Sequence, residues 1–153
     1  MSGELRQYVN TKVVGSWTTP LGTVDILDGA VRTADFVAAS NDGGDRWAIE
    51  GDGNGNATRT KNSNRVGGIA VTISASSPTN LKLTKLAEAD DQLENIVGVL
   101  ELRDKNGDSK IVMTGAFLLD IPPGTFGASR GVRVWRWACA RKQERAGGHN
   151  LVG

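Results

Sequence analysis

Histidine and cysteine, two residue types that often act in catalysis near neutral pH, each occur once in this sequence. The single histidine, His149, lies in a Gly-Gly-His-Asn segment near the C-terminus, where no predicted element would fix the orientation of its ring. The single cysteine, Cys139, lies between two alanines and is expected to be a small buried apolar residue. Arg136 and Arg141 could lower the pKa of the Cys139 thiol, but a nucleophilic cysteine also needs a base to orient it. The sequence therefore predicts no catalytic residues, no cofactor and no enzyme activity.

Two short segments resemble the first half of a calcium-binding loop. Asp104–Asp108 and Asp52–Asn56 both place carboxylate or amide oxygens at alternate positions, as such loops do. Neither segment continues with the glycine and the glutamate that the calcium-binding loop requires at its sixth and twelfth positions. Asn106-Gly107 is instead a typical hairpin-turn pair, and the glycines within 51–55 tolerate positive φ. We therefore predict two hairpin turns and no metal site.

The elements that would position these residues are mostly strands. Glycine makes up 20 of the 153 residues, which indicates many tight turns between short strands. Apolar and polar side chains alternate through 69–74 and 130–141, as expected of strands with one buried face. Trp47 and Ile49 share one face of a third such segment and are assigned to the core. Strands are predicted at 13–17, 22–27, 31–39, 46–50, 58–60, 69–74, 96–103, 110–119 and 130–141.

One helix is predicted, from Pro78 to Asp90. Ser77 is its expected N-cap, and Pro78 suits the first helical position. The residues that follow at helical spacing, and that should face the core, are Leu83, Leu86 and Ala87.

Together these elements predict an all-β to α+β fold. The expected architecture is a β-sandwich or barrel of about seven or eight strands with one flanking α-helix. Residues 1–153 are expected to form a single domain, since no composition shift or repeat divides them. Within it we predict an extended loop at 51–65, which has almost nothing apolar, and a flexible C-terminal tail at 147–153.

The charge is balanced overall but unevenly distributed. Eighteen Lys and Arg against 17 Asp and Glu give a net charge of +1. Strong electrostatic binding to nucleic acid or anionic lipid is therefore not expected. Residues 25–52 and 88–120 are rich in acids, whereas residues 130–145 are rich in Arg and Lys. These segments are either solvated faces of separate strands or complementary patches that steer head-to-tail self-association.

The number of cysteines and the first residues of the chain indicate the compartment in which the protein is made. A lone cysteine cannot form an intramolecular disulfide, and residues 1–6 lack the apolar stretch of a signal peptide. No apolar run has the length that spans a bilayer. The sequence therefore predicts a soluble protein made inside the cell.

Several short segments, spread over nearly the whole chain, form a family pattern. They are the opening 8–14, the turn 51–55, the strand 71–73 with 77–80, the hairpin 104–107, the run 121–123 with Phe126-Gly127, and Trp135 in the last strand. The most specific of them is a strand that runs through Ser-Pro-Thr-Asn into a helix. In these segments the chain resembles the tail tube proteins of contractile-tailed bacteriophages (myophages). Trp17, Trp137 and the Arg-rich end have no counterpart in the family pattern.

The resemblance implies a structural role rather than turnover. Subunits of this family form hexameric rings around a channel, and the rings stack into a hollow tube through which the genome is ejected. The implied partners are further copies of the chain, the sheath, the terminator or neck and baseplate hub proteins, the tape measure protein, and dsDNA passing without sequence recognition. The implied location is the virion tail, assembled in the host cytoplasm, and type VI secretion tubes share the architecture.

The residues expected to contact other subunits lie in the loop and in the basic segment. They are Asp52, Asn54, Arg59, Lys61, Arg65, Arg141, Lys142 and Arg145. Two alternatives remain open at this point. The chain could be a monomeric β-sandwich binding module, for example for carbohydrate, with Trp17, Trp47 or Trp135 stacking on a sugar. It could also be a related component of a baseplate or secretion tube.

Overall fold

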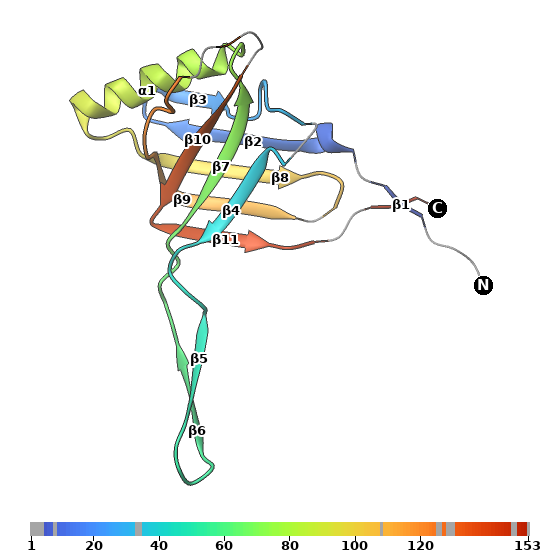
Figure 1. Ribbon diagram of the computed structural model, residues 1–153, viewed down its shortest axis with the longest axis vertical. Coiled ribbons are helices and arrows are strands. Elements are labelled where there is room, and N and C mark those ends of the chain that lie inside the picture. The colour runs from blue at the N-terminus through green and yellow to red at the C-terminus, as the bar shows by residue number, and fades with distance from the viewer. Residues whose placement is uncertain are drawn as a thin grey trace.

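The structure, a computed structural model, describes residues 5–7, 9–32, 35–107, 109–124, 127, 131–147 and 150–152 (Figure 1). This part of the chain contains twelve strands, one α-helix, α1 (Thr79–Leu93), and one 3₁₀ helix, η1 (Asn10–Lys12). Tyr8, Asp108, Phe126, Arg130 and His149, which entered the sequence analysis, lie outside the described residues. The strands are β1 (Leu5–Gln7), β2 (Val13–Thr19), β3 (Gly22–Asp25), β4 (Val37–Asn41), β5 (Trp47–Gly51), β6 (Ala57–Lys61), β7 (Gly67–Ser74), β8 (Gly98–Asp104), β9 (Lys110–Leu118), β10 (Val132–Cys139), β11 (Arg141–Arg145) and β12 (Asn150–Val152).

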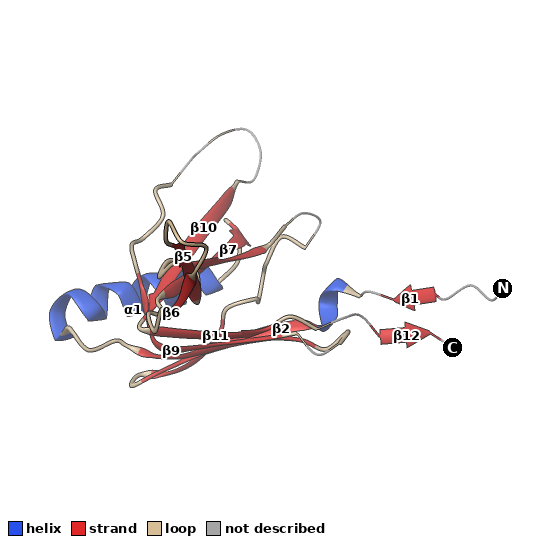
Figure 2. Cartoon of the chain, turned by 90° about the horizontal axis from the view of Figure 1, so that it is seen from below, coloured by secondary structure: helices blue, strands red, loops and turns tan. Residues whose placement is uncertain are grey.

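Eight strands form one antiparallel sheet that folds over on itself. Its order is β3-β2-β8-β9-β10-β7-β4, and β11 also pairs with β9. Gly115 in β9 has a φ of 70° and divides the strand, so that Lys110–Thr114 pairs with β11 while Phe117 and Leu118 pair with β10. Figure 2 shows the result: β2, β9 and β11 lie in one layer, and β7 and β10 cross it in a second. The predicted sandwich with one flanking helix is confirmed.

The predicted strand at 130–141 is two strands, which corrects the sequence assignment. β10 ends at Cys139, and after Ala140 the chain leaves β7 and pairs with β9 as β11. The Cβ atom of Ala140 lies where a side chain at Gly115 would meet it, so the two bends are packed against each other. This bend turns the Arg-rich segment toward the edge of the other layer.

The core lies between the two layers and includes three tryptophans. Trp17, Trp135 and Trp137 are fully buried, as are the alternating residues of β7 that the sequence assigned to the core. The rings of Trp17 and Trp137 meet edge to face, with 5.9 Å between their centroids and 77° between their planes. The two tryptophans that have no counterpart in the tail-tube pattern are therefore core residues.

The two tryptophans of this edge-to-face pair should respond differently to loss of their N–H group. Trp17 Nε1 donates to the Ala116 carbonyl oxygen at 3.2 Å, whereas Trp137 Nε1 has no acceptor among the described residues. Both substitutions to Phe remove a similar ring volume, but only Trp17→Phe leaves a buried carbonyl without this donor. We expect Trp17→Phe to lower the free energy of unfolding by about 1 kcal/mol more than Trp137→Phe, measured by chemical denaturation. An equal or larger loss for Trp137→Phe would contradict this assignment.

Helix α1 covers one end of the sandwich. It begins at Thr79, so the predicted start is confirmed to within one residue. The N-cap is Pro78 and not Ser77 as predicted, and Ser77 Oγ accepts a hydrogen bond from the Thr79 backbone N–H at 3.3 Å. Trp135 Nε1 donates to Asn80 Oδ1 at 2.9 Å and ties the helix to β10. The helix continues past the predicted end to Leu93, and Glu94 follows it in the left-handed conformation.

Leu83 should be the residue that couples α1 to the core. Its side chain is fully buried, as predicted. Leu83→Ala should lower the free energy of unfolding by about 2–5 kcal/mol, because it removes buried methyl groups and leaves a cavity. Thermal unfolding of the variant checks this, and an unchanged melting temperature would show that the helix does not pack as described.

The turn between β8 and β9 holds the N-terminal segment. Asn106 is buried, its Nδ2 donates to the Val9 carbonyl oxygen at 2.8 Å, and its Oδ1 accepts from the Val9 N–H at 2.7 Å. Residues 104–107 therefore form a hairpin turn, as predicted, and the Asn106 side-chain amide bonds both to the Val9 backbone and to the Asp104 carboxylate. Beyond it β1 pairs with β12, so the predicted C-terminal tail contains a strand that the sequence pattern did not indicate. Its flexibility stays a prediction.

Candidate functional site

The most distinctive feature is a two-stranded arm, residues 46–62, that projects from the sandwich (Figure 1). β5 and β6 pair only with each other. At the base of the arm, the Asn62 N–H donates to the Arg46 carbonyl oxygen and Asn62 Nδ2 donates to the Gly43 carbonyl oxygen, both at 2.7 Å. The predicted extended loop at 51–65 therefore includes the tip of this hairpin, its second strand β6 and residues at its base.

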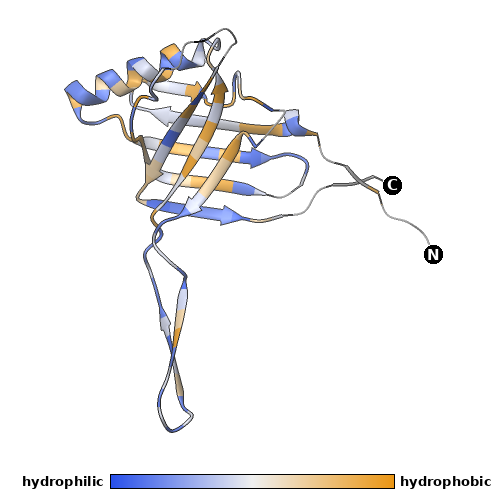
Figure 3. Ribbon diagram, in the orientation of Figure 1, coloured by the Kyte–Doolittle hydropathy of each residue, from blue (hydrophilic) through white to orange (hydrophobic). Residues whose placement is uncertain are grey.

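The assignment of Trp47 and Ile49 to the core is wrong. Both lie on the arm, with 45% and 77% of their surface exposed. They alternate as strand residues should, but no second layer covers the face they share. Figure 3 shows this as an apolar stretch on an otherwise polar ribbon. The alternation correctly predicted a strand here, but it wrongly predicted that one face of this strand is buried in the core.

The two faces of the arm differ in chemistry. The register places Trp47 and Ile49 on the same face as Arg59 and Lys61, and the Arg59 guanidinium lies 3.4 Å from the centroid of the Trp47 ring. The opposite face carries small and polar side chains, with Glu50 as its charged residue. Such a cation–π contact orders the guanidinium and leaves the apolar face flanked by two positive charges.

The tip of the arm is a tight turn held by Asp52. One carboxylate oxygen accepts hydrogen bonds from the N–H groups of Asn54 at 2.8 Å and Asn56 at 3.0 Å. These backbone bonds lower the pKa of the Asp52 carboxyl, which is fully exposed. Because the folded-state pKa is depressed, this turn is favoured above the usual pKa of an aspartate and weakens as the pH falls below it. The tip therefore presents a negative charge at neutral pH.

A groove of about 620 Å³ lies between the base of the arm and the edge of the sandwich. Arg65 and Lys142 meet there: the Lys142 N–H donates to the Arg65 carbonyl oxygen at 2.8 Å, so β11 supports the arm. The other lining residues are Asn41, Gly43, Gly44, Asp45, Arg46, Trp47, Asn64, Val66, Glu144 and Ala146.

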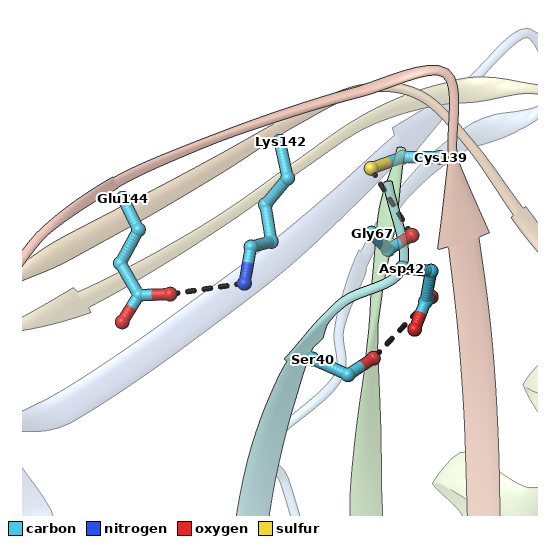
Figure 4. Close-up of polar contacts among 6 residues, drawn as sticks. All are labelled: Ser40, Asp42, Gly67, Cys139, Lys142 and Glu144. Carbon is cyan, nitrogen blue, oxygen red and sulfur yellow. Dashed lines mark hydrogen bonds and ion pairs between the residues drawn. The ribbon is translucent and has the colours of Figure 1, made fainter. Parts of the chain in front are cut away.

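Lys142 differs from an ordinary surface lysine. Only 5% of its surface is exposed, and its Nζ lies 3.0 Å from Glu144 Oε1 (Figure 4). Its charge is therefore already paired within the subunit, which limits the intersubunit contact predicted for it. In the same region Cys139 is buried as predicted, and burial raises the pKa of its thiol.

The other predicted contact residues fall into two groups. Asp52, Asn54, Arg59 and Lys61 lie on the exposed arm, while Arg141 and Arg145 lie exposed on β11 at the edge of the sandwich. Their role as contacts stays a prediction. Trp47 and Ile49 also lie exposed on the arm, although the sequence pattern had assigned them to the core and not to contacts between subunits. The polar composition around them was the signal that no core could form there.

Two further properties limit the chemistry of the described part of the chain. It contains no group of three or more His, Cys, Asp or Glu side chains placed to hold a metal ion. None of its helices is long and apolar enough to cross a bilayer.

Comparison with known proteins identifies the fold. No protein-family model matches the chain, and no curated protein matches it. Among solved structures, the tube-terminating cap of the anti-feeding prophage matches with a TM-score of 0.60 at 13% identity, over 95% of each chain. The sheath–tube complex of PVC, an extracellular contractile injection system, in its extended state, matches with a TM-score of 0.58 at 13% identity, over 92% of each chain. The chain therefore has a fold found in components of contractile injection systems.

Proposed function

We propose that this chain is a structural subunit of a contractile-tail tube. In this proposal its copies form hexameric rings, the rings stack around a channel, and the tube carries a phage genome at ejection. The fold supports the proposal, because the matched structures are a tube cap and a sheath–tube complex and the similarity covers nearly the whole chain. The tail-tube resemblance of the sequence points in the same direction, and the role is one of assembly rather than turnover.

The projecting arm is the observation that carries the proposal. A two-stranded ribbon with no covering layer is marginal in water by itself, and this one exposes Trp47 and Ile49. A neighbouring subunit would bury that face and add contacts for Arg59 and Lys61. We propose that the arm forms the contact between stacked rings, and that its cations meet acidic segments of the adjacent ring.

The proposed partners follow from the same role. They are further copies of the chain, the sheath, the terminator and baseplate hub proteins, and, within the channel, the tape measure protein and dsDNA. A net charge of +1 suits a channel that DNA must leave, because a strongly basic lumen would retain it. The proposed location is the tail of the virion.

The carbohydrate-binding alternative is less well supported. Trp17 and Trp135 are fully buried and cannot stack on a sugar, while one face of Trp47 is covered by Arg59. The remaining alternative is a related component of a baseplate or secretion tube. A baseplate component would differ from a tube subunit in that its rings would not stack repeatedly.

Self-association of the purified chain tests the proposal. Size-exclusion chromatography with light scattering should show oligomers whose mass rises with concentration. A chain that stays monomeric at the highest attainable concentration would count heavily against a tube subunit.

A further inference from the structure

We propose that copies of this chain join end to end, with Leu93 of one copy entering an apolar cavity at the opposite end of the next. This contact rests on the proposed function, because it would join neighbouring subunits within one ring. It is distinct from the arm, which we assign to contacts between rings.

The receiving cavity lies at the end of the sandwich where β8 meets β9. Its volume is about 180 Å³, and its apolar lining comes from Val13, Val37, Leu102 and Ile111. An apolar cavity of about 150 Å³ accommodates a benzene molecule, so this one has room for a leucine side chain. Three of these four residues are only partly buried, and a second copy would complete their burial.

The rim of the cavity carries a row of positive charges. The register places Arg103 opposite Lys110, and Lys110 opposite Arg145, on three adjacent strands. Like charges directly opposite each other destabilise a sheet, so this row costs the isolated subunit free energy. Lys110 Nζ lies 3.3 Å from Glu101 Oε1, which compensates for part of that repulsion. An acidic partner would compensate for more of it.

The two acids on the rim are already engaged within the subunit. Asp104 Oδ1 accepts hydrogen bonds from the backbone N–H and the side-chain Nδ2 of Asn106, at 2.9 and 2.8 Å. Glu144 pairs with Lys142. The cavity lining thus carries three cations, Arg103, Lys110 and Arg145, against the two carboxylates Asp104 and Glu144, and its net charge is positive.

The inserting end is the C-terminus of α1. Leu93 follows Leu86 by seven residues and so continues the face that α1 buries, yet 56% of its surface is exposed. Figures 1 and 2 show the reason: this end of the helix extends past the edge of the sheet. Leu93 is therefore a core-type side chain with no core beneath it.

The charge around Leu93 complements the rim. Its exposed neighbours Asp91 and Glu94 are acidic, and Glu88 is exposed on the same end of the helix. Asp90 adds a further negative charge there, and one of its carboxylate oxygens accepts a hydrogen bond from the Ile96 N–H at 3.1 Å. Acids at a helix C-terminus oppose the helix dipole, so they destabilise the isolated subunit as the cationic row does. Opposite charges at the two ends would steer one copy onto the next.

The two ends lie on opposite sides of the subunit. In Figure 1 the C-terminus of α1 is at the left, and the ends of β8 and β11 are at the right. A contact between unlike surfaces is heterologous, and it closes into a ring when the rotation between copies allows. The arm runs at right angles to this direction, downward in Figure 1 and toward the viewer in Figure 2. A tube of stacked rings requires subunit contacts in two different directions, one that closes each ring and one that stacks the rings.

Charge reversal at each end tests this contact. One variant carries Asp91→Lys and Glu94→Lys, which suit a helix C-terminus, and the other carries Arg103→Glu and Arg145→Glu, which give the row alternating signs. Each variant alone should need a concentration about tenfold or more higher than the wild type to associate. An equimolar mixture should associate again, because each reversed helix end then meets a reversed rim and each unchanged end meets an unchanged rim.

A second pair of variants tests the apolar part. Leu93→Ser should weaken association, whereas Leu81→Ser, at the other end of the same helix and 59% exposed, should not. Light scattering and sedimentation measure association, and circular dichroism confirms that each variant is folded. The contact would be overturned if both charge variants associated like the wild type, or if their mixture stayed dissociated. Rings could then still form, but through a different contact. A wild-type chain that never associates would overturn both.

Discussion

Replacing Trp47–Lys61 with a short Gly-Ser turn should leave the sandwich folded and abolish tube formation. The Arg46 carbonyl oxygen and the Asn62 N–H are only 2.7 Å apart, so a few residues can join them without strain. The removed strands pair only with each other and contribute nothing to the core. If the arm connects rings, the variant loses that contact entirely while ring formation is retained. Thermal unfolding and electron microscopy of the same preparation measure the two effects.

Matched substitutions on the arm then show which face makes the contact. Trp47→Ser with Ile49→Ser removes the apolar face, and Thr58→Ala with Thr60→Ala shortens two side chains on the opposite face and leaves the apolar face intact. We expect the first pair to prevent stacking and the second pair to leave it unchanged. If the variant that lacks Trp47–Lys61 still forms long tubes at the wild-type rate, the arm has no role in assembly.

Gly98→Ala should destabilise the fold severely. A Cβ atom at Gly98 would overlap the carbonyl oxygen of Thr18, which belongs to the rigid backbone of β2. The position lies where the register of β8 shifts against β9, so neither neighbouring strand can give way without losing its pairing. We expect a loss of about 4 kcal/mol or more, sufficient to unfold a domain of ordinary stability.

Gly53→Ala is the control for that substitution. Gly53 lies at the tip of the arm with no atom within 4 Å of an added Cβ, and its φ lies outside the left-handed region. Its effect on the free energy of unfolding should stay within about 0.5 kcal/mol. Denaturant titration of both variants compares them directly. A Gly98→Ala protein as stable as the wild type would contradict the close approach of β2 and β8.

Much of the fold could be predicted because local signals determine it. The alternation within β7 and β10, the Ser77-Pro78 start of α1, and the Asn106-Gly107 turn all act over a few residues. Pairing of β1 with β12 could not be predicted, since it joins the two ends of the chain and neither strand carries a distinctive pattern. The division of β9 at Gly115 was equally hidden, because a glycine within a strand pattern does not show which way the strand bends.

The site was harder to predict than the fold for one physical reason. Alternation shows that a strand face needs cover, but it does not show whether that cover comes from the same subunit. Trp47 was assigned to the core on this basis and lies on the exposed arm. Leu93 has the helical spacing of a core residue and extends past the sheet. Lys142 shows the opposite case, since a basic residue in a charged segment is buried in an ion pair.

Electron microscopy of the purified, unmodified chain tests the proposed function most directly. Images recorded over a range of protein concentrations should show rings with a central channel, and at higher concentration hollow tubes of stacked rings. Compact single particles at every concentration, with neither rings nor tubes, would contradict the proposal that this chain is a tube subunit.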